Sequence, residues 1–599
     1  MKCLISLAIY FFSISLFAAA LFSIGNPTAE EQLYLEYINR ARANPAQESL
    51  IIILAPNKEI RASIFQNNVD TNLFVQQLSS YPKVMPLSFS SNLIFAARRH
   101  ANDQYIYNFQ SHIGSDGSNP GSRISDSGYS WNTYGENAFT RSYSLFYGHS
   151  SFEIDWGCCG AGGMQDPPGH RNNIHNGNFG EIGIGVTNQV VVQEFASKFG
   201  LTPFITGVVY VDFNNNDFYD IGEGIGGIDV IVIGSSYYAT SSSSGGYSVP
   251  VQTNGNYTVV FTDNLTLTNI SSVMVTNGWN YKKDYKIAYH KPEILSKSYI
   301  VLGKTNLYSF VPTFKNRTTY EVKTSNLIEE TPIEDGNQYT NFLLSISTNY
   351  SFSDGGLMRL VHSYPFDQIA TLNYSIKPST NSYLTFLSRL GWVTSNEYAS
   401  VEYSIDNKNW LSLWSKNGNN GSRPVENELN LVTNYIGFLA GQEVYFRFLY
   451  DYVGGSYFYS TSFGVGWYFD AIEFSNSKRY INNCVLIGAN NSFRAFVTNF
   501  NDLYLKVREV VDGNILPWGV EKKAVAIPEH VQIQSFRLVK PDFLISFYSL
   551  PDVTYKLFRS LDLTNWAIVD TIIGNGDTVI FTDSFSIISP KCFYRIKAE

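Results

Sequence analysis

The sequence has little of what marks nucleic-acid-binding or disulfide-rich proteins. Its 42 lysine and arginine residues are outnumbered by 51 aspartate and glutamate residues, which gives a formal net charge of −9. No basic excess is available to neutralise phosphate groups, so we expect no nucleic-acid partner. Only five cysteines and five methionines occur among 599 residues, and 44% of the chain is hydrophobic. That hydrophobic fraction excludes a largely disordered chain.

Long apolar runs are absent except near the start of the sequence. Residues 4–20 form one such run after Lys2, and it ends in three alanines. This order of positive charge, apolar segment and small residues is typical of a secretory signal peptide. We therefore expect residues 1–20 to be removed, leaving a secreted, periplasmic or cell-surface protein without a stable membrane span. An uncleaved membrane anchor is the alternative.

Helical periodicity is confined to the first third of the chain. Apolar residues recur at helical spacing over 30–44 and again from about 91, whereas the period changes to two from about 206. A chain of this length suggests about four domains. We predict a multidomain protein of mixed α+β and all-β class, with these parts: an α+β domain at 26–202, β-sandwich-like modules at 203–316, 317–480 and 531–599, and a linker and irregular segment at 481–530.

Four cysteines remain once Cys3 leaves with the signal peptide. They are Cys158, Cys159, Cys484 and Cys592. Four thiols allow three pairings, and the sequence does not choose among them. A bridge between the two adjacent cysteines and a staple joining the last two both stay open.

Five of the eight histidines lie between residues 100 and 175. His112, Glu136 in a Gly-Glu-Asn run, and His170 in a Gly-His-Arg-Asn-Asn run stand out among them. Two imidazoles and one carboxylate can hold a metal weakly or pass protons, so we expect these three side chains to share one surface. His100 falls on an apolar helix face and is expected in the core. We expect His149 and His175 to be exposed or in loops.

These runs occur in an order that resembles the CAP superfamily, which includes cysteine-rich secretory proteins, antigen 5 and plant pathogenesis-related proteins. The resemblance covers residues 26–200 and is strongest for the bacterial branch. It rests on the following residues: Ile38-Asn39-Arg40-Ala41-Arg42, His112, Asp116-Gly117, Arg123, Gly128-Tyr129, Gly135-Glu136-Asn137, Trp156, Gly169-His170-Arg171-Asn172-Asn173-Ile174 and Gly183-Ile184-Gly185.

The resemblance implies an α-β-α sandwich with a surface cleft that holds two histidines and two glutamates. His112 then matches the first histidine, Glu136 the first glutamate and His170 the second histidine. The second glutamate is left open, because Glu153 and Asp155 precede Trp156 whereas the family's residue follows that tryptophan. A shared cleft does not imply a shared reaction.

Three functions follow, and whether the protein is an enzyme stays open. The first is binding of a lipid, peptide or cell-wall component through the cleft. The second is a metal-assisted extracellular hydrolase, with His112 and His170 as zinc ligands and Glu136 as base or third ligand, because no nucleophile motif is present. The third is a structural adhesin.

A twelve-residue run after residue 211 has the spacing of a calcium loop. Oxygen-bearing side chains stand at positions 1, 3, 5, 9 and 12, and a backbone carbonyl is available at position 7: Asp212, Asn214, Asn216, Asp220, Glu223 and Phe218. Position 6 is Asp217, where glycine is expected. We predict a Ca²⁺ site flanked by strands. Residues 203–290 resemble the B-type repeats of bacterial Ser-Asp-repeat surface adhesins, which implies a calcium-stiffened stalk.

The C-terminal half carries weaker resemblances. The runs at 444–448 and 464–472 are similar to jelly-roll accessory modules of secreted bacterial proteases and carbohydrate-active enzymes, which implies a polysaccharide partner. Residues 531–599 resemble a fibronectin-like module without a site. The runs at 404–410 and 560–566 share Ser, Asp, Asn and Trp at equal spacing. We expect both to be hairpins that pack the tryptophan.

Overall fold

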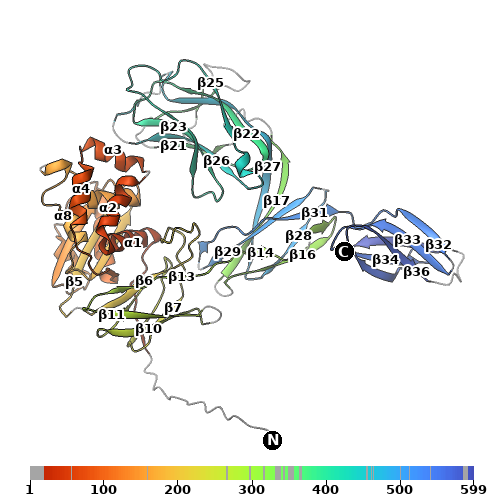
Figure 1. Ribbon diagram of the computed structural model, residues 1–599, viewed down its shortest axis with the longest axis horizontal. Helices are drawn as coiled ribbons and strands as arrows, with labels where there is room; N and C mark the ends of the chain where they lie inside the picture. The colour runs from red at the N-terminus through yellow and green to blue at the C-terminus, as the bar shows by residue number, and fades with distance from the viewer. Residues whose placement is uncertain are drawn as a thin grey trace, which may run out of the picture. The chain divides into compact units, whose positions relative to one another are not determined.

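The computed structural model describes residues 19–599 apart from 56, 158–159, 201, 265–267, 296–297, 315–317, 331–338, 341–344, 348–356, 363–366, 454–455, 460–461, 463, 500, 512, 540 and 585–590. The chain forms two compact units, one up to Tyr289 with the short stretch Val511–Asn514 and one from His290 onward (Figure 1). The expected signal peptide lies outside the described residues except for its last two. Within the described residues, no helix has the length and hydropathy needed to cross a membrane.

The first part of the first unit is an α+β domain around a four-stranded sheet. The sheet has the order β2-β4-β5-β3, with β3 at one edge. The strands are β2 Ser88–Phe89, β3 Thr133–Phe139, β4 Glu181–Thr187 and β5 Val190–Ser197. The helices are α1 Ala29–Ala43, α2 Pro45–Leu54, α3 Lys58–Gln66, α4 Thr71–Ser79, α5 Ser91–Tyr107, α6 Pro120–Asp126, α7 Leu145–Ile154 and α8 Gly169–Ile174.

Helices cover both faces of this sheet, as an α-β-α sandwich requires. On one face, Ala97 of α5 belongs to an apolar cluster with Val192 of β5. On the other face, Ile38 of α1 clusters with Ile184 of β4. The helical spacing in the sequence therefore predicted α1 and α5 and their buried faces correctly.

Strand β4 lies so close to α5 that it needs a glycine at the contact. A Cβ atom on Gly183 would stand 1.9 Å from the backbone carbonyl carbon of Leu93. Real Cβ atoms do not approach backbone this closely, because interiors are packed to contact distance. Gly183 therefore sets the separation of the helix and the sheet.

Helix α1 is fastened to the rest of the domain by two polar side chains from its NRAR run. Asn39 exchanges two hydrogen bonds with the backbone of Leu87. Arg42 is fully buried, and its guanidinium donates to four backbone carbonyls, those of Met85, Ile174, Asn176 and Phe179. Burial lowers the pKa of Arg42 to about 9. These bonds hold the segment that follows α8 against α1.

The second part of the first unit is a β-sandwich. One sheet has the order β1-β8-β7-β10-β11, and the other has β12-β6-β13 with β9 on β6. The strands are β1 Ala20–Leu21, β6 Phe204–Tyr210, β7 Asp229–Val232, β8 Tyr237–Thr240, β9 Gly246–Pro250, β10 Gly255–Thr262, β11 Thr268–Val275, β12 Tyr281–Lys282 and β13 Tyr285–Lys286. Strand β1 spans the expected cleavage point after Ala20, and it joins this sandwich by pairing with β8.

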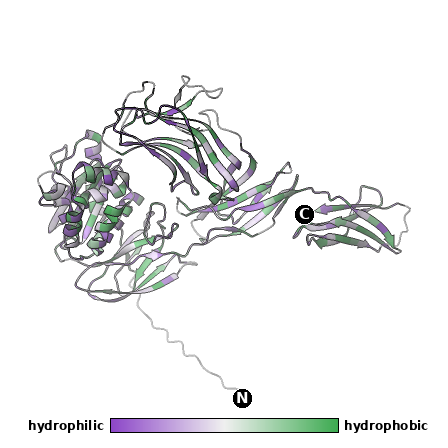
Figure 2. Ribbon diagram, turned by 45° about the horizontal axis from the view of Figure 1, so that its top comes forward, coloured by the Kyte–Doolittle hydropathy of each residue, from purple (hydrophilic) through white to green (hydrophobic). Residues whose placement is uncertain are grey.

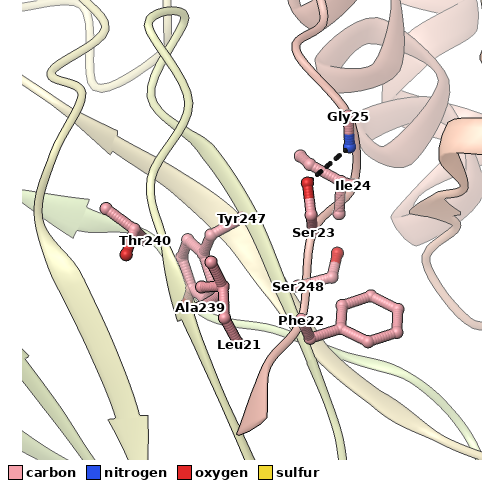
Figure 3. A pocket seen from close by; sticks show the side chains of 9 residues that line it. All are labelled: Leu21, Phe22, Ser23, Ile24, Gly25, Ala239, Thr240, Tyr247 and Ser248. Carbon is pink, nitrogen blue, oxygen red and sulfur yellow. Dashed lines mark hydrogen bonds between the residues drawn. The ribbon is translucent and has the colours of Figure 1, made fainter.

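Residues 21–25 lie along this sandwich around a small cavity of about 60 Å³ (Figure 3). Phe22 packs against Phe204 and Tyr237, with ring centroids 5.5 and 6.0 Å apart. The expected signal peptide therefore borders a segment that belongs to the folded unit.

The second unit contains two sandwiches that share one long strand, β27 Trp467–Gly488. Its last part pairs with β17, and its first part pairs with β20 and β22. The inner group of strands is β14 Glu293–Ile294, β15 Tyr299–Val301, β16 Thr305–Val311, β17 Thr318–Glu329, β28 Ser492–Phe496, β29 Leu503–Val511, β30 Asn514–Ile515 and β31 Lys522–Ile527. The inserted group is β18 Tyr339–Thr340, β19 Ser345–Ser347, β20 Leu357–Leu360, β21 Gln368–Leu372, β22 Ile376–Leu390, β23 Glu397–Ser404, β24 Leu411–Asn417, β25 Asn430–Tyr435 and β26 Tyr445–Tyr452.

Residues 481–530, for which we expected a linker and an irregular segment, instead hold the end of β27 and strands β28 to β31. Strand β29 alternates buried and half-buried residues along its length. Figure 2 colours the strands by hydropathy and shows hydrophobic and hydrophilic residues in succession along them. The expectation was wrong because these strands pair with partners before residue 330, across the inserted sandwich.

A third group of strands ends the second unit. It forms two sheets with the orders β32-β33-β36 and β35-β34-β37. The strands are β32 Ser535–Val539, β33 Asp542–Tyr548, β34 Thr554–Ser560, β35 Ala567–Ile573, β36 Thr578–Asp583 and β37 Phe593–Ala598. The chain therefore has an α+β domain followed by a strand-rich region with several sheets.

Candidate functional site

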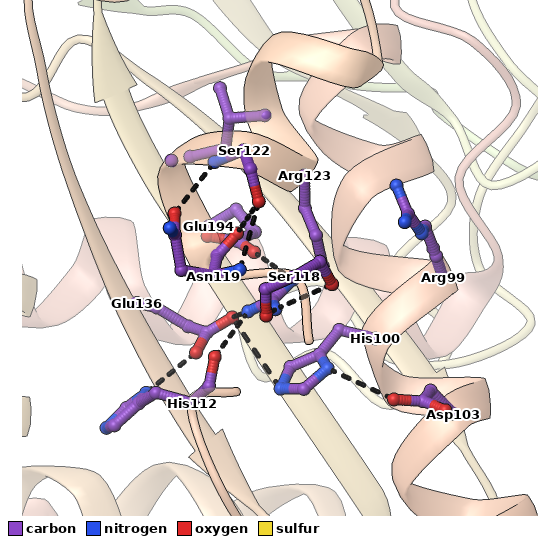
Figure 4. Close-up of polar contacts among 12 residues, drawn as sticks. Arg99, His100, Asp103, His112, Ser118, Asn119, Ser122, Arg123, Glu136 and Glu194 are labelled. Atoms are coloured by element: carbon purple, nitrogen blue, oxygen red, sulfur yellow. Dashed lines mark hydrogen bonds and ion pairs between the residues drawn. The ribbon is translucent and has the colours of Figure 1, made fainter. Parts of the chain in front are cut away.

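The first histidine of the candidate site, His112, is held by a buried carboxylate on the edge strand β3. His112 Nδ1 lies 2.7 Å from Glu136 Oε1, and Arg123 Nη2 of α6 donates to Glu136 Oε2 (Figure 4). The Glu136 side chain is 1% exposed, whereas that of His112 is 58% exposed. The hydrogen bond to Glu136 raises the pKa of His112. The imidazole is thus fixed at one nitrogen and open to solvent.

The second histidine, His170, has its own carboxylate partner. His170 Nδ1 lies 2.6 Å from Asp155 Oδ1, and the backbone N–H of His170 donates to Asp155 Oδ2 at 3.0 Å. Asp155 is the left-handed C-cap of α7, with φ 55°. The His170 side chain is 26% exposed. We call His112, Glu136, Asp155 and His170 the paired-histidine site.

Asp155, which precedes Trp156, is the carboxylate that bonds His170. Glu153, the other carboxylate near that tryptophan, is fully buried and pairs with His175 instead. Sequence reasoning missed the role of Asp155. The usable signal was its place at the end of α7, where a left-handed aspartate can turn back toward the next helix.

The two histidine pairs are tied together through β3 and α8. Asn137 Nδ2 donates to the His170 carbonyl at 3.2 Å, and Asn173 Nδ2 donates to the Glu136 carbonyl at 3.1 Å. Gly135 fits closely here, because a Cβ atom would lie 2.7 Å from Asn173 Oδ1 and would displace that side chain. The Gly-Glu-Asn run therefore lets α8 rest directly on the strand that carries Glu136.

The other three histidines of the cluster are buried parts of the scaffold. His100 is fully buried and its Nε2 bonds the Ser111 carbonyl at 2.8 Å, as expected for a core histidine. His149 and His175 were expected to be exposed or in loops. This is wrong for His149, which lies in α7, whereas His175 stands in the turn after α8 but is buried. They are 0% and 4% exposed and bond Glu48 and Glu153.

No cluster of three or more His, Cys, Asp or Glu side chains suited to a metal ion occurs among the described residues. In the paired-histidine site both carboxylates bond the Nδ1 atoms, and the Nε2 atoms of His112 and His170 have no hydrogen-bond partner in the described part of the chain. Such carboxylates orient imidazoles, as the outer partners of metal-bound histidines do. The protein side chains thus offer zinc two nitrogen ligands, with Glu136 occupied by His112 and Arg123.

The predicted calcium loop connects β6 to β7 and packs against α1. Asn214 and Asn216 donate to Asp220 Oδ2 at 2.7 and 2.8 Å. Position 6, Asp217, has φ 56°, the left-handed conformation for which glycine was expected. The Phe218 ring stacks on Tyr37 of α1, with centroids 5.6 Å apart.

Two features of the loop bear on its affinity for a cation. Burial raises the pKa of Glu223 to about 7, and its two oxygens accept from the backbone N–H groups of Phe213 and Asp220. Lys286 Nζ pairs with Asp217 and lies 3.3 Å from Asp212 Oδ2. Its ammonium group therefore places a positive charge beside Asp212, one of the predicted ligands.

The cysteines that the structure describes are not bridged. Cys484 and Cys592 are free thiols, so the staple left open above is not formed. Cys158 and Cys159 lie outside the described residues.

Comparison with known proteins identifies the first domain. Residues 35–195 match the model of the cysteine-rich secretory protein family, CAP. No curated protein matches the chain. An extracellular protein containing an SCP domain from Bacillus anthracis str. Ames is 20% identical, over 23% of this chain and 41% of that one, with a TM-score of 0.17. Carbohydrate-binding modules from the β-sandwich superfamily are 11% identical, over 46% of this chain and 98% of theirs, with a TM-score of 0.15. The family match therefore rests on the N-terminal domain.

Proposed function

We propose that this chain is an exported CAP-domain protein that binds an extracellular or envelope ligand through the paired-histidine site. The observation that supports this is a pair of solvent-reachable imidazoles, each fixed at Nδ1 by a buried carboxylate. This fixing leaves both Nε2 atoms available to a ligand. The β modules then act as stalk and attachment surface.

The alternative is a metal-assisted hydrolase. His112 and His170 would hold the zinc through Nε2, with Glu136 and Asp155 orienting the rings, and the metal would supply an activated water. Structural zinc usually takes four protein ligands and catalytic zinc three. With two imidazoles on offer, we favour ligand binding without a resident metal. If experiments exclude both ligand binding and metal-assisted hydrolysis, the structural adhesin is the remaining function.

Variants of the full chain test these functions. The double variant His112→Ala, His170→Ala should no longer be retained on phosphatidylethanolamine–phosphatidylglycerol vesicles or on insoluble peptidoglycan. The control variant His290→Ala, at an exposed residue, should be retained like the wild type. Calorimetric titration of the protein with Zn²⁺ alone tests the metal hypothesis separately from ligand binding. Unchanged retention by the double variant would exclude this site, and stoichiometric zinc binding lost only in that variant would favour the hydrolase.

We also propose that the loop at 212–223 binds Ca²⁺ and stiffens the sandwich that carries it. The alternating oxygen side chains and the left-handed Asp217 support this. Asp212, Asn214, Asn216, Asp220 and Glu223 with the Phe218 carbonyl would hold the ion. Binding to the folded state alone raises stability with the logarithm of calcium concentration.

A polysaccharide is the proposed partner of the inserted sandwich. Tyr383 of β22 and Tyr435 of β25 are direct cross-strand neighbours, 42% and 48% exposed, with ring centroids 5.4 Å apart. Exposed neighbouring aromatic rings offer apolar faces to sugar rings. Tyr383→Ala with Tyr435→Ala should reduce sedimentation of the full chain with insoluble cell-wall polysaccharide, whereas Phe536→Ala on the exposed β32 should not. Equal sedimentation of all three proteins would refute this partner surface.

A further inference from the structure

A further buried glutamate, Glu194 of β5, lies behind the paired-histidine site. Strands β3 and β5 pair so that Glu136 stands directly opposite Glu194. Paired residues in antiparallel strands project to the same face of the sheet. Here that face is covered by α5. Both residues are buried, with 7% of Glu136 and none of Glu194 exposed.

The hydrogen-bond donors around this pair bond Glu136 and not Glu194. Arg123 of α6 is the one guanidinium in contact among the described residues, bonding Glu136 directly and placing its Nε 3.6 Å from Glu194 Oε1. From α5, His100 Nε2 bonds the Ser111 carbonyl and lies 4.0 Å from Glu136 Oε2, and burial lowers the pKa of this ring. The two cationic groups that bond this pair, Arg123 and a protonated His112, direct their hydrogen bonds to Glu136 and none to Glu194. Two buried carboxylates that face each other favour a proton on one of them.

The remaining charged groups near this face are already paired. Asp103 of α5 lies 3.9 Å from His100 Nδ1 and bonds Ser115. Glu181 of β4 accepts from the Tyr129 hydroxyl and lies 3.5 Å from Lys198. None of these groups supplies a second positive charge to Glu194.

Hydrogen bonding decides which carboxyl holds the proton. Glu136 accepts from Arg123 and bonds His112, as an ionised group does. Neither oxygen of Glu194 accepts a hydrogen bond from a side chain or backbone group in the described part of the chain. A buried carboxylate without donors would be strongly destabilised, whereas a protonated carboxyl needs only one acceptor.

We propose that Glu194 stays protonated and donates to Glu136, as a positioning residue for His112. Burial and the charge of Glu136 raise the pKa of Glu194 well above its ordinary range. Glu136 then keeps a single negative charge shared among His112, Arg123 and the Glu194 proton. This inference rests on the proposed role of the paired-histidine site, and it makes Glu194 the group that fixes the charge state of that site.

Glu194→Gln in the full chain tests the proposal without any ligand. The amide keeps the shape and the donor of a protonated carboxyl, so the pKa of His112, measured by NMR of labelled histidine, should stay within about 0.2 of the wild-type value. Glu136→Gln is the control and should lower it clearly. A fall of more than about 0.5 in the Glu194→Gln protein would show that Glu194 is ionised and would overturn the proposal.

Two further readouts do not depend on that titration. The infrared difference spectrum, wild type minus Glu194→Gln at pH 7, should contain the carbonyl band of a protonated carboxylic acid. A carboxylate band in its place refutes the proposal.

Because the folded pKa of Glu194 lies above the unfolded one, the wild type should lose stability relative to Glu194→Gln as pH rises above about 4.5. The Tm difference should therefore grow from about pH 5 to pH 8, and a constant difference counts against it. Failure of these measurements leaves the envelope-binding test of His112 and His170 unaffected, so the two outcomes can be separated.

Discussion

Glu443 is a buried carboxylate of the second unit that is held between two ammonium groups. Lys323 Nζ lies 2.5 Å and Lys506 Nζ 2.9 Å from Glu443 Oε2, while Ser375 Oγ donates to Oε1 at 2.7 Å. Burial alone would raise the pKa of Glu443, but the two ammonium groups lower it to about 2. Lys323 is itself only 3% exposed. Removing the carboxylate would leave a buried cation without its counter-charge.

We therefore expect Glu443→Gln to destabilise the second unit by roughly 3–5 kcal/mol at pH 7. Because the folded pKa is depressed, this stabilisation is present above the unfolded pKa of about 4.5 and is lost as pH falls toward 2. Urea denaturation at pH 7 and pH 3 measures both effects. The exposed Glu428→Gln serves as the control. A loss below about 1 kcal/mol in the Glu443→Gln protein would contradict the argument.

Single residues also show what the sequence could reveal about the site. His112, Glu136 and His170 were predicted as site residues from short sequence motifs, and the structure connects all three through β3 and α8. Asp155 was not assigned, because its role depends on the left-handed turn at the end of α7. The burial of His149 and His175 was not predicted, because their carboxylate partners, Glu48 and Glu153, come from contacts that no local pattern contains.

At the scale of elements, the contact between α5 and β4 gives a sharp prediction. Gly183→Ala would place a methyl group inside the backbone of α5, and neither element can give way without opening the sheet. We expect a loss of at least about 3 kcal/mol in the first unit. Gly169→Ala, whose Cβ meets nothing within 4 Å, should change stability by less than about 1 kcal/mol. Thermal unfolding followed by near-ultraviolet circular dichroism compares the two. Equal Tm values would show that β4 does not need a glycine there.

Hairpin chemistry was readable from sequence where the interactions are local. Asp406 and Asp562 accept matching backbone hydrogen bonds from the residues two and three positions later. In both hairpins an arginine from the neighbouring strand stacks on the tryptophan, Arg447 at 4.4 Å and Arg595 at 4.0 Å. The turns follow from the Ser, Asp and Asn spacing. The stacking arginines, in contrast, lie far from these turns in the sequence.

At the scale of the whole molecule, sequence order and domain order differ. Strand β17 and the end of β27 are neighbours in one sheet although the whole inserted sandwich separates them in the sequence. A reading along the chain therefore placed boundaries at 316 and 480, where the inner group of strands is only interrupted. Discontinuous domains arise from long-range pairing, which periodicity within one segment cannot detect.

The two compact units predict how calcium should act on the complete protein. Each unit has its own cores, so we expect two unfolding transitions, which Gly183→Ala and Glu443→Gln identify by lowering one each. The loop at 212–223 belongs to the first unit. Calcium at a hundredfold excess over its dissociation constant should therefore stabilise only the first transition, by about 2.7 kcal/mol.

Lys286 provides the discriminating variant, because its ammonium group competes with a cation for Asp212 and Asp217. Lys286→Met should lower the transition without calcium, since two carboxylates then repel, and should tighten calcium binding measured by calorimetry. Lys283→Met, between β12 and β13 and without a carboxylate partner in the described residues, is the matched control. If calcium moves the second transition, or if Lys286→Met binds calcium no better than the wild type, the loop is a lysine-neutralised turn and the stalk is stiffened by protein contacts alone.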